Sequence, residues 1–364
     1  MRPTSCEIDL GAVARNVRFL REMVAPTPFC AVVKANGYGH GSVQVAETAL
    51  EAGASWLAVA TIEEGVELRE AGMAAPILLL SEPPLGSMPV VAQHRLVPTL
   101  YSPAGIAAMA DAAPTDGRFP VQLAVDTGMR RVGAEAGAVQ ALIETISSSV
   151  NLELDGVWTH CPVADEPENP FTDEQLETFD RLVDSLPDGV SHHVANSAAA
   201  ITRPTRPGAM ARFGIAMYGI DPSPDLAGKA DLEPSLRLTS SVSFVKPIRA
   251  GEGVGYGHRW TASVDTTIAT LPIGYADGVR RDLGLRGGSV LIGGVPRPIR
   301  GVVTMDQLMV DVGESPVSVG DEAVLIGRQG ESVISAADVA ATLDTIPYEV
   351  VCAIGARVPR VYKR

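Results

Sequence analysis

The lysine at position 34 is the residue with the clearest chemical potential in this sequence. It follows the apolar run Phe29–Val33, which is short and β-branched at its end and therefore predicts a buried strand. Gly37, Gly39 and Gly41 come next, where the backbone can turn tightly or approach a ligand. A partly desolvated lysine can lose its proton, which an arginine cannot do, and the neutral amine can form an imine with a carbonyl compound.

A structural interpretation of Lys34 is also open. Lysine is scarce in this chain, with four lysines among 29 basic residues. A lysine at the end of a strand often lays its stem along the strand and holds its ammonium in water. Lys246 is an internal comparison, because it precedes Pro247 without a glycine-rich loop, and we interpret it as structural.

Further polar residues follow other predicted strands. Asn196 and Ser197 stand where a strand passes into a helix, and Arg212 precedes Gly214. Phosphate groups bind to backbone N–H donors and hydroxyls as much as to charge. These residues therefore indicate a phosphate site, although Ser197 considered alone is more typical of a helix N-cap.

Strand-like and helix-like segments alternate through the first 220 residues. With the Lys34 strand, the strand candidates are Trp56–Ala60, Pro76–Ser81, Leu96–Leu100, Val121–Asp126, Leu154–His160, Ser191–Asn196 and Phe213–Tyr218. This pattern predicts an α/β fold with an N-terminal (β/α)8 TIM-type barrel, and a doubly wound sheet is the alternative. In a barrel the side chains that follow the strands meet at one mouth, where active sites lie.

The clearest helix is expected over Thr172–Leu186. Thr172 and Gln175 fit a capping box, and Leu176 and Phe179 belong to one apolar face. The spacing of the apolar residues therefore predicts an amphipathic helix that packs on the barrel.

Beyond Ile220 the pattern changes to short alternating runs separated by glycine and proline. We expect strands there and one short helix, at Thr239–Phe244, Thr266–Leu271, Ser289–Ile292, Pro298–Met305, Gln307–Val312, Glu322–Ile326 and, for the helix, Ala336–Leu343. The sequence thus predicts two domains, a barrel over residues 1–235 and a mainly β domain over residues 236–364.

Composition narrows the class of protein. The net charge of −14 argues against a nucleic-acid surface. No apolar run approaches the roughly 20 residues of a membrane span, and the first 30 residues lack the apolar region of a signal peptide. The four cysteines are widely separated and show no metal-binding spacing. We expect a cytoplasmic protein with free thiols and no metal.

The segment VVKANGYGHG around Lys34 resembles the pyridoxal 5'-phosphate attachment segment of the alanine racemase family. The resemblance continues through the chain to RVPRVY at its end. It implies a pyridoxal-phosphate-dependent racemase that interconverts L-alanine and D-alanine. It also implies a homodimer in which the β domain of one subunit completes the active site of the other.

The resemblance assigns roles to individual residues. Lys34 would carry the cofactor and act on one face of the substrate, and Tyr256 of the other subunit would act on the opposite face. A free tyrosine has a pKa of about 10, so this base would need help. His160 would link Tyr256 to Arg212, which would donate to the pyridine nitrogen. The remaining cofactor-binding residues would be Tyr38, Asn196, Ser197, Gly214 and Ile215.

Three residues are implied in substrate binding. Arg131 would orient the substrate carboxylate, Met305 would offer its backbone N–H, and Tyr275 would line the entrance. The neighbouring Arg130 is expected to face solvent. Considered alone, Met305 is more typical of a core and Tyr275 of a strand aromatic.

Several positions depart from the family pattern. Ala124 stands where many members carry a carbamylated lysine that holds the arginine equivalent to Arg131. Ala356 replaces a tyrosine found in some relatives, and Val302 and Thr304 replace a common arginine and cysteine. These departures leave the preferred substrate open.

Four alternatives to an alanine racemase follow from the residues. They are a racemase for serine or larger amino acids, a decarboxylase on the same plan, a non-catalytic cofactor-binding protein, and a sugar-phosphate enzyme that uses Lys34 without the cofactor. The GYG and MDQ segments favour racemisation over decarboxylation. The sequence does not distinguish a supply of D-alanine for the cell wall from a specialised pathway.

Overall fold

The computed structural model describes residues 2–184, 186–187, 189–203 and 209–364. The chain forms two compact units. The barrel unit comprises Ala12–Glu233, and the β unit comprises Met1–Gly11 together with Pro234–Arg364. Residues 1–11, which the sequence-based division assigns to the barrel, therefore belong with the C-terminal half.

The barrel unit contains a closed ring of parallel strands. Two sheets, β10-β2-β3-β4 and β5-β6-β8-β9, are joined by the bridges Leu78–Val97 and His192–Ala209. This closure confirms the (β/α)8 prediction and excludes an open doubly wound sheet. The strands are β2 (Phe29–Val32), β3 (Trp56–Val59), β4 (Ile77–Leu79), β5 (Thr99–Leu100), β6 (Phe119–Asp126), β8 (Leu152–Trp158), β9 (Ser191–His193) and β10 (Ala211–Phe213).

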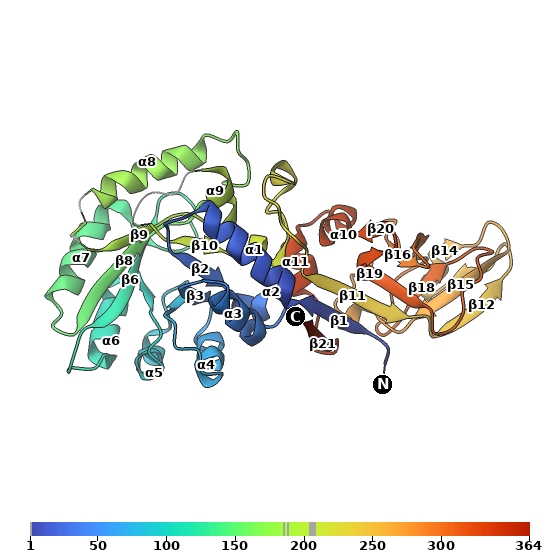
Figure 1. The fold of residues 1–364 in the computed structure, drawn as a ribbon, viewed down its shortest axis with the longest axis horizontal. Coiled ribbons are helices and arrows are strands. Elements are labelled where there is room, and N and C mark those ends of the chain that lie inside the picture. The colour runs from blue at the N-terminus through green and yellow to red at the C-terminus, as the bar shows by residue number, and fades with distance from the viewer. Residues whose placement is uncertain (1, 185, 188, 204–208) are drawn as a thin grey trace. The chain divides into compact units, whose positions relative to one another are not determined.

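Helices surround these strands on the outside of the ring (Figure 1). They pack through apolar stripes, as in α1, where Val13, Val17 and Leu20 are fully buried. A short strand, β7 (Ala134–Glu135), adds to β6. The helices are α1 (Leu10–Met23), α3 (Ser42–Glu51), α4 (Ile62–Glu70), α5 (Met88–Gln93), α6 (Pro103–Ala112), α7 (Val139–Ser148), α8 (Phe171–Val183) and α9 (Ser197–Thr202).

Two predictions for the barrel unit are wrong in detail. The eighth strand ends at Phe213, and Ile215–Tyr218 forms a 3-10 turn because the chain bends at Gly214. Helix α8 begins at Phe171 with Pro170 as its N-cap, so Thr172 lies inside the first turn and does not form the predicted capping box with Gln175.

The β unit is built on a large twisted sheet with the strand order β17-β16-β19-β11-β1-β21, extended by β20 on β19. Smaller sheets are formed by β12, β15 and β18 and by β13 and β14. The strands are β1 (Ser5–Asp9), β11 (Leu236–Ser241), β12 (Phe244–Ile248), β13 (Gly253–Val254), β14 (Trp260–Thr261), β15 (Thr266–Leu271), β16 (Ser289–Ile292), β17 (Val295–Pro298), β18 (Leu308–Asp311), β19 (Glu322–Gln329), β20 (Ser332–Ile334) and β21 (Arg360–Lys363).

The short helix α10 (Ala336–Leu343) and strands β15 and β16 have the predicted bounds. The strand predicted at Pro298–Met305 is wrong beyond its first residue. Gly301 has φ +69°, and a Cβ on it would lie 2.7 Å from the carbonyl oxygen of Val254, so the backbone leaves the extended conformation there. A second helix, α11 (Pro347–Cys352), was not predicted.

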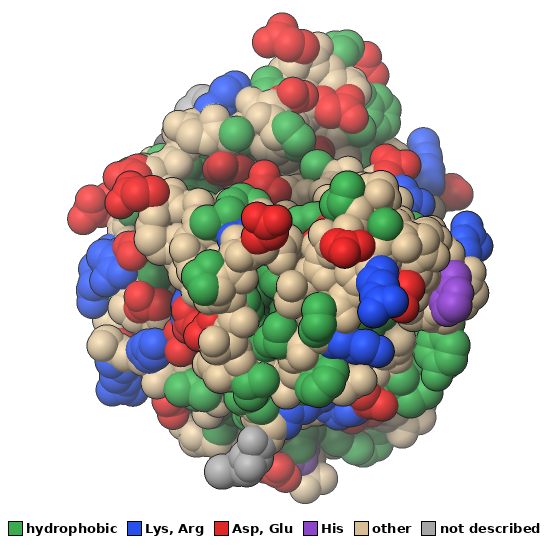
Figure 2. Space-filling model, turned by 90° about the vertical axis from the view of Figure 1, so that its right-hand side faces the viewer, with side chains coloured by type: hydrophobic (Ala, Val, Ile, Leu, Met, Phe, Trp, Pro, Cys, Tyr) green, Lys and Arg blue, Asp and Glu red, His purple; other side chains and the backbone are tan. Residues whose placement is uncertain are grey.

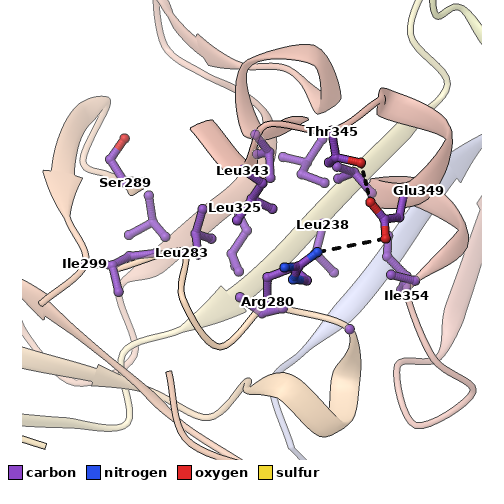
Figure 3. A pocket seen from close by; sticks show the side chains of 17 residues that line it. Leu238, Arg280, Leu283, Ser289, Ile299, Leu325, Leu343, Thr345, Glu349 and Ile354 are labelled. Carbon is purple, nitrogen blue, oxygen red and sulfur yellow. Dashed lines mark hydrogen bonds and ion pairs between the residues drawn. The ribbon is translucent and has the colours of Figure 1, made fainter. Parts of the chain in front are cut away.

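A pocket of about 620 Å³, part of it open to solvent, lies within the β unit (Figure 3). Its walls are mainly apolar, with Leu238, Leu283 and Leu325 among them. At one end Glu349 accepts a hydrogen bond from Thr345 and lies 3.9 Å from Nη1 of Arg280. None of the predicted site residues lines this pocket.

The described surface carries scattered apolar side chains. On the face seen in Figure 2 they are interspersed with acidic and basic side chains. No helix among the described residues has the length and apolar character that crossing a membrane requires.

Candidate active site

The segment after Lys34 adopts a rare conformation. Lys34 lies just past the carboxyl end of β2, and Ala35, Asn36, Gly37 and Tyr38 all have φ between +52° and +59°. Left-handed backbone is unfavourable for residues other than glycine, and consecutive residues in it are rarer still. Such strain persists only where the surroundings enforce it, and it marks this turn as a functional segment.

Hydrogen bonds from outside the turn hold it in place. The amide of Ala35 donates to Oε1 of Glu64 at 2.6 Å, and the amide of Ser42 donates to Oδ1 of Asn36 at 3.2 Å. The hydroxyl of Tyr218 donates to the carbonyl of Val32 at 3.0 Å, at the end of the Lys34 strand. Sequence analysis missed Glu64, because a helix N-terminal glutamate is common and gives no sign of a second partner.

Three groups that suit a phosphate converge beside this turn. The amide of Gly214 donates to Oγ of Ser197 at 3.0 Å, and both residues are buried. A Cβ on Gly214 would lie 2.4 Å from the hydroxyl oxygen of Tyr38. A glycine is therefore required at position 214 for the tyrosine hydroxyl to lie over the backbone. Ile215, also buried, follows directly.

Asn196, and not Ser197, caps helix α9. Oδ1 of Asn196 accepts the amide of Ala199 at 2.9 Å, and its Nδ2 donates to the carbonyl of Cys161 at 3.1 Å. The alternative interpretation of Ser197 as an N-cap is therefore wrong, and its hydroxyl is available to the Gly214 amide.

Arg212 is buried at the end of the eighth strand, with 3% of its surface exposed. Its Nη1 donates to Nδ1 and to the carbonyl of His193, and its Nη2 donates to the carbonyl of Thr159 at 2.8 Å. The guanidinium stacks on the ring of Trp158 at 4.9 Å. Burial lowers the pKa of Arg212 to about 10, so the group remains charged at neutral pH.

His160 lies two residues beyond strand β8. Its Nδ1 is 3.3 Å from Nη2 of Arg212. Burial lowers the pKa of His160 to about 3, and the positive charges of Arg212, Arg131 and Lys34 act in the same direction. His160 therefore lies close enough to these three predicted site residues to sense their charges. Its ring is neutral at physiological pH.

Arg131 faces a small hollow of about 260 Å³, part of it open to solvent, that Ala124 also lines. Among the described residues no carboxylate forms an ion pair with Arg131, and Ala124 is buried, with 2% of its surface exposed. The neighbouring Arg130 is 77% exposed and pairs with Asp126, as its predicted solvent-facing position requires.

The β unit carries Tyr256 on an exposed turn. The side chain of Tyr256 is 73% exposed and lies between Gly255 at φ +71° and Gly257 at φ +69°. A large aromatic side chain that is this exposed is typical of a surface that meets a partner.

Tyr275 and Met305 lie on two segments that hydrogen-bond to each other. The amide of Tyr275 donates to the carbonyl of Thr304 at 2.9 Å, and the amide of Ala276 donates to the carbonyl of Met305 at 3.1 Å. Tyr275 is 42% exposed and Met305 is 52% exposed. The interpretations of these residues considered alone, with Met305 in a core and Tyr275 in a strand, are therefore wrong.

A buried carboxylate supports these two segments. Asp277 accepts both Nη groups of Arg2, at 2.9 and 2.8 Å, and the amide of Gly274 at 2.9 Å. Arg357 lies 3.4 Å from Asp277 and 2.7 Å from Asp306, next to Met305. Sequence analysis missed Asp277, because its partners are 275 and 80 residues away.

The remaining departures from the family pattern have clear positions. Val302 is buried, with 1% exposed, and the hydroxyl of Thr304 donates to the carbonyl of Gln307 at 2.8 Å. Ala356 is exposed. Among the described residues no group of three potential ligands could hold a metal ion.

Comparisons with known proteins cover the whole chain. The family model for the N-terminal domain of alanine racemase matches residues 8–222, and that for the C-terminal domain matches residues 235–362. The alanine racemase of Symbiobacterium thermophilum is 45% identical over 368 residues, which cover 100% of this chain and 97% of that relative.

Solved structures agree with the sequence matches. The crystal structure of alanine racemase from E. faecalis superposes with a TM-score of 0.95 at 38% identity, covering 100% of this chain and 98% of that one. The alanine racemase from Bacillus anthracis with bound L-Ala-P superposes with a TM-score of 0.92 at 37% identity, covering 100% and 96%. The similarity thus extends over both units.

Proposed function

Because this chain belongs to the alanine racemase family, we propose that it interconverts L-alanine and D-alanine with pyridoxal 5'-phosphate as its cofactor. One observation carries the proposal. Lys34 lies two residues past the end of the first barrel strand, and the left-handed turn after it brings the hydroxyl of Tyr38 against Gly214, whose amide donates to Ser197.

The residues at the mouth of the barrel fit this cofactor. Tyr38 and Ser197 would donate their hydroxyls to its phosphate, and the amide of Gly214, which donates to Oγ of Ser197, would orient the serine hydroxyl toward it. The Nε–H of Arg212 has no acceptor among the described residues, although the guanidinium is buried. A ring nitrogen would satisfy this donor.

Bound pyridoxal phosphate supplies an aldehyde that attaches to amines and a ring that withdraws electrons from the α carbon. Lys34 would be the attachment point in the resting enzyme. Arg212 keeps its charge and can only donate, so it leaves a pyridine nitrogen unprotonated. The ring is then a weaker electron sink, which limits side reactions while still permitting removal of the α proton.

Inversion of the α carbon requires proton transfer on both of its faces. We assign Lys34 to one face and Tyr256 of the partner subunit in a homodimer to the other. The exposure of Tyr256 supports this assignment, because its own unit leaves the phenol uncovered. His160 is neutral, and its ring contacts Arg212 through Nδ1. The Nε2 side of His160 would therefore be free to hydrogen-bond the phenol of the partner subunit.

Substrate binding would use one residue of the barrel unit and two of the β unit. Arg131 lacks an ion-pair partner among the described residues and suits a carboxylate, which it can bind through two hydrogen bonds. Met305 would offer its backbone N–H to the same carboxylate, and Tyr275 would line the entrance. A reduced, cytoplasmic setting fits the buried free thiols of Cys6, Cys30 and Cys161.

A broader substrate range is the second candidate function. Ala356 is small and exposed where some relatives have a tyrosine, so the pocket could admit serine or larger side chains. Comparing the turnover of L-alanine, L-serine and L-lysine tests this candidate, and a strong preference for alanine rejects it. A decarboxylase on the same fold is the weaker alternative, and release of CO₂ would identify it.

The decisive experiment is incubation of the cofactor-loaded protein with L-alanine in D₂O. We expect D-alanine with deuterium at Cα. We also expect deuterium at Cα of the L-alanine that is recovered. Borohydride reduction followed by peptide mapping should place the pyridoxyl label on Lys34. A label elsewhere, or no inversion and no exchange, overturns the proposal.

A further inference from the structure

Four polar side chains bond in series through the interior of the barrel. They come one each from strands β8, β6, β9 and β10. Nε2 of Gln122 donates to Asp155 at 2.6 Å, Oε1 of Gln122 lies 3.0 Å from Nε2 of His193, and Nδ1 of His193 contacts Nη1 of Arg212. Gln122 and His193 are completely buried. Sequence analysis assigned no role to Asp155, Gln122 or His193.

The chemistry of Arg212 fixes the direction of every bond in this chain. A guanidinium can only donate, so Nδ1 of His193 must be the acceptor. A neutral histidine then carries its proton on Nε2 and donates it to Oε1 of Gln122. The amide nitrogen of Gln122 is left to donate to Asp155. The four groups are therefore compatible in a single arrangement, with the carboxylate at one end and the guanidinium at the other.

The interior of the barrel favours this arrangement over its alternatives. Burial lowers the pKa of His193 well below its ordinary value, and the charge of Arg212 acts in the same direction, so the ring stays neutral. A Cβ on Gly156 would lie 2.5 Å from Oε1 of Gln122, so the glycine leaves the room that the amide occupies. Reversal of any link would leave a buried donor or acceptor unpaired.

Two kinds of contact hold the guanidinium of Arg212: the ring of Trp158 on one face and hydrogen bonds at its edge. The ring of Trp158 lies 4.9 Å from Cζ of Arg212 and covers the guanidinium on that side, but a contact of this kind does not set the rotation of the group within its own plane. The acceptors on His193, Thr159, His160 and Val194 take up the hydrogens of Nη1 and Nη2. Only Nε–H then lacks an acceptor among the described residues.

We propose that Asp155, Gln122 and His193 are positioning residues that set the in-plane orientation of Arg212 and so determine that Nε–H is the donor offered at the barrel mouth. The inference rests on the proposed function, in which that donor meets the ring nitrogen of the cofactor. Without the chain, His193 can turn, Nη1 keeps only the carbonyl of His193 as an acceptor, and the guanidinium can present a different N–H.

A direct test needs no cofactor. In a histidine ¹H–¹⁵N correlation spectrum of the full protein at neutral pH, His193 should be the Nε2–H tautomer, with His193→Gln used to assign its signal. The Nδ1–H tautomer, or a protonated ring, would overturn the chain as drawn.

The functional test uses Gln122→Met, which removes both bonds of the amide at similar volume. Residues that hydrogen-bond to the ligands of a metal site commonly change activity about 10- to 100-fold when they are removed, and we take the same range for residues behind Arg212. We expect a loss of that size in kcat with little change in the KM for alanine. The absorption band of the bound cofactor should shift, and pyruvate from stray transamination should rise per racemisation turnover.

Two further variants separate positioning from simple destabilisation. Asn151→Ala removes buried hydrogen bonds to Ala110 and Ala113 at the other end of β8, and it should leave the absorption band and the pyruvate ratio unchanged. The double variant Gln122→Glu with Asp155→Asn places the carboxylate at position 122 and the amide at position 155. It keeps an acceptor for His193, so the absorption band and the pyruvate ratio should return toward the wild-type values relative to Gln122→Met.

The outcomes distinguish this inference from the proposed function. If borohydride labels Lys34 and the Gln122→Met enzyme retains the wild-type band, pyruvate ratio and kcat, the inference alone is wrong. If no label reaches Lys34 in the wild-type protein, the proposed function is wrong, and the histidine spectrum still tests the chain itself.

Discussion

The two units hold their site residues in opposite ways. In the barrel unit, Arg212, Ser197 and Tyr38 are 3%, 5% and 8% exposed and are fixed by contacts within the same unit. In the β unit, Tyr256 and Met305 are 73% and 52% exposed, so the contacts that fix their segments leave both side chains uncovered. The barrel side is organised in advance by its own chain, whereas the β side offers side chains that need a second surface to become ordered. This difference is the physical basis of the proposed shared active site.

The largest effect on activity should come from removing the proton-transfer group of either unit. Lys34→Ala and Tyr256→Phe should each lower racemisation about 10²- to 10⁴-fold, the range of a positioned proton-transfer group. If each site combines the two subunits, a mixture of the two inactive variants should recover about a quarter of wild-type activity after exchange of subunits, because half of the dimers are mixed and each mixed dimer has one intact site. Activity assays before and after mixing measure this.

An absence of recovery after exchange, with mixed dimers demonstrated by differential tags, would contradict a site shared between subunits. The contrast between the two units would then need another explanation. The Lys34→Ala protein mixed with wild type serves as the control for subunit exchange.

The next effect concerns the buried side of the comparison. Gly214→Ala places a methyl group 2.4 Å from the hydroxyl oxygen of Tyr38, so the tyrosine or the backbone must move. We expect about tenfold or greater weakening of cofactor binding, because the hydroxyl and the Gly214 amide would no longer converge. Titration of the cofactor-free protein, followed by absorbance, measures it. Gly86→Ala is the control for a simple glycine replacement, because Gly86 has no positive φ and an added Cβ would meet nothing within 4 Å.

The exposed segments of the β unit depend on the buried carboxylate of Asp277, which can be removed. Asp277→Asn leaves Arg2 without a bidentate carboxylate and weakens the contact to Arg357. Because Arg2 and Arg357 are 27% and 47% exposed, the cost should be that of hydrogen-bonding groups left without their partner, about 1–3 kcal/mol. We expect a lower unfolding midpoint and a raised KM for alanine, since the segments of Tyr275 and Met305 lose their support. Denaturant unfolding and steady-state kinetics together test this, and an unchanged KM would separate Asp277 from the site.

The smallest effect is a dependence of stability on pH that belongs to the barrel side. In the folded protein the pKa of His160 is about 3, against 6.5 for the ordinary group. The unfolded chain therefore binds the proton first as the pH falls, so the stability contributed by neutral His160 is complete above pH 6.5 and is lost progressively toward pH 3. At pH 5 the loss amounts to about 2 kcal/mol.

Urea unfolding of the wild type and of His160→Asn between pH 7.5 and 5 measures this contribution. The difference between the two unfolding free energies should fall as the pH is lowered. A difference that is constant across this range would show that His160 titrates normally in the folded protein.

The sequence predicted the barrel because alternation of strands and helices is a local signal that many residues carry together. It could not predict the left-handed turn, since Ala35, Asn36 and Tyr38 ordinarily avoid positive φ and only the fold enforces it. The same holds for Asp277 and for His193, whose partners are distant along the chain. The Ser197 and Thr172 capping alternatives failed because capping motifs are short and tertiary contacts decide which residue serves.

Strand β1 has a consequence for how this protein can be divided. It pairs with β11 on one side and with β21 on the other, although the chain then leaves for the barrel and returns only at residue 234. Two peptide connections therefore join the units, and a single cut cannot release either one whole. A fragment that starts near residue 236 would leave β11 and β21 with unpaired edges, so a split or fused version of this enzyme must keep its first eleven residues with its last hundred and thirty or so.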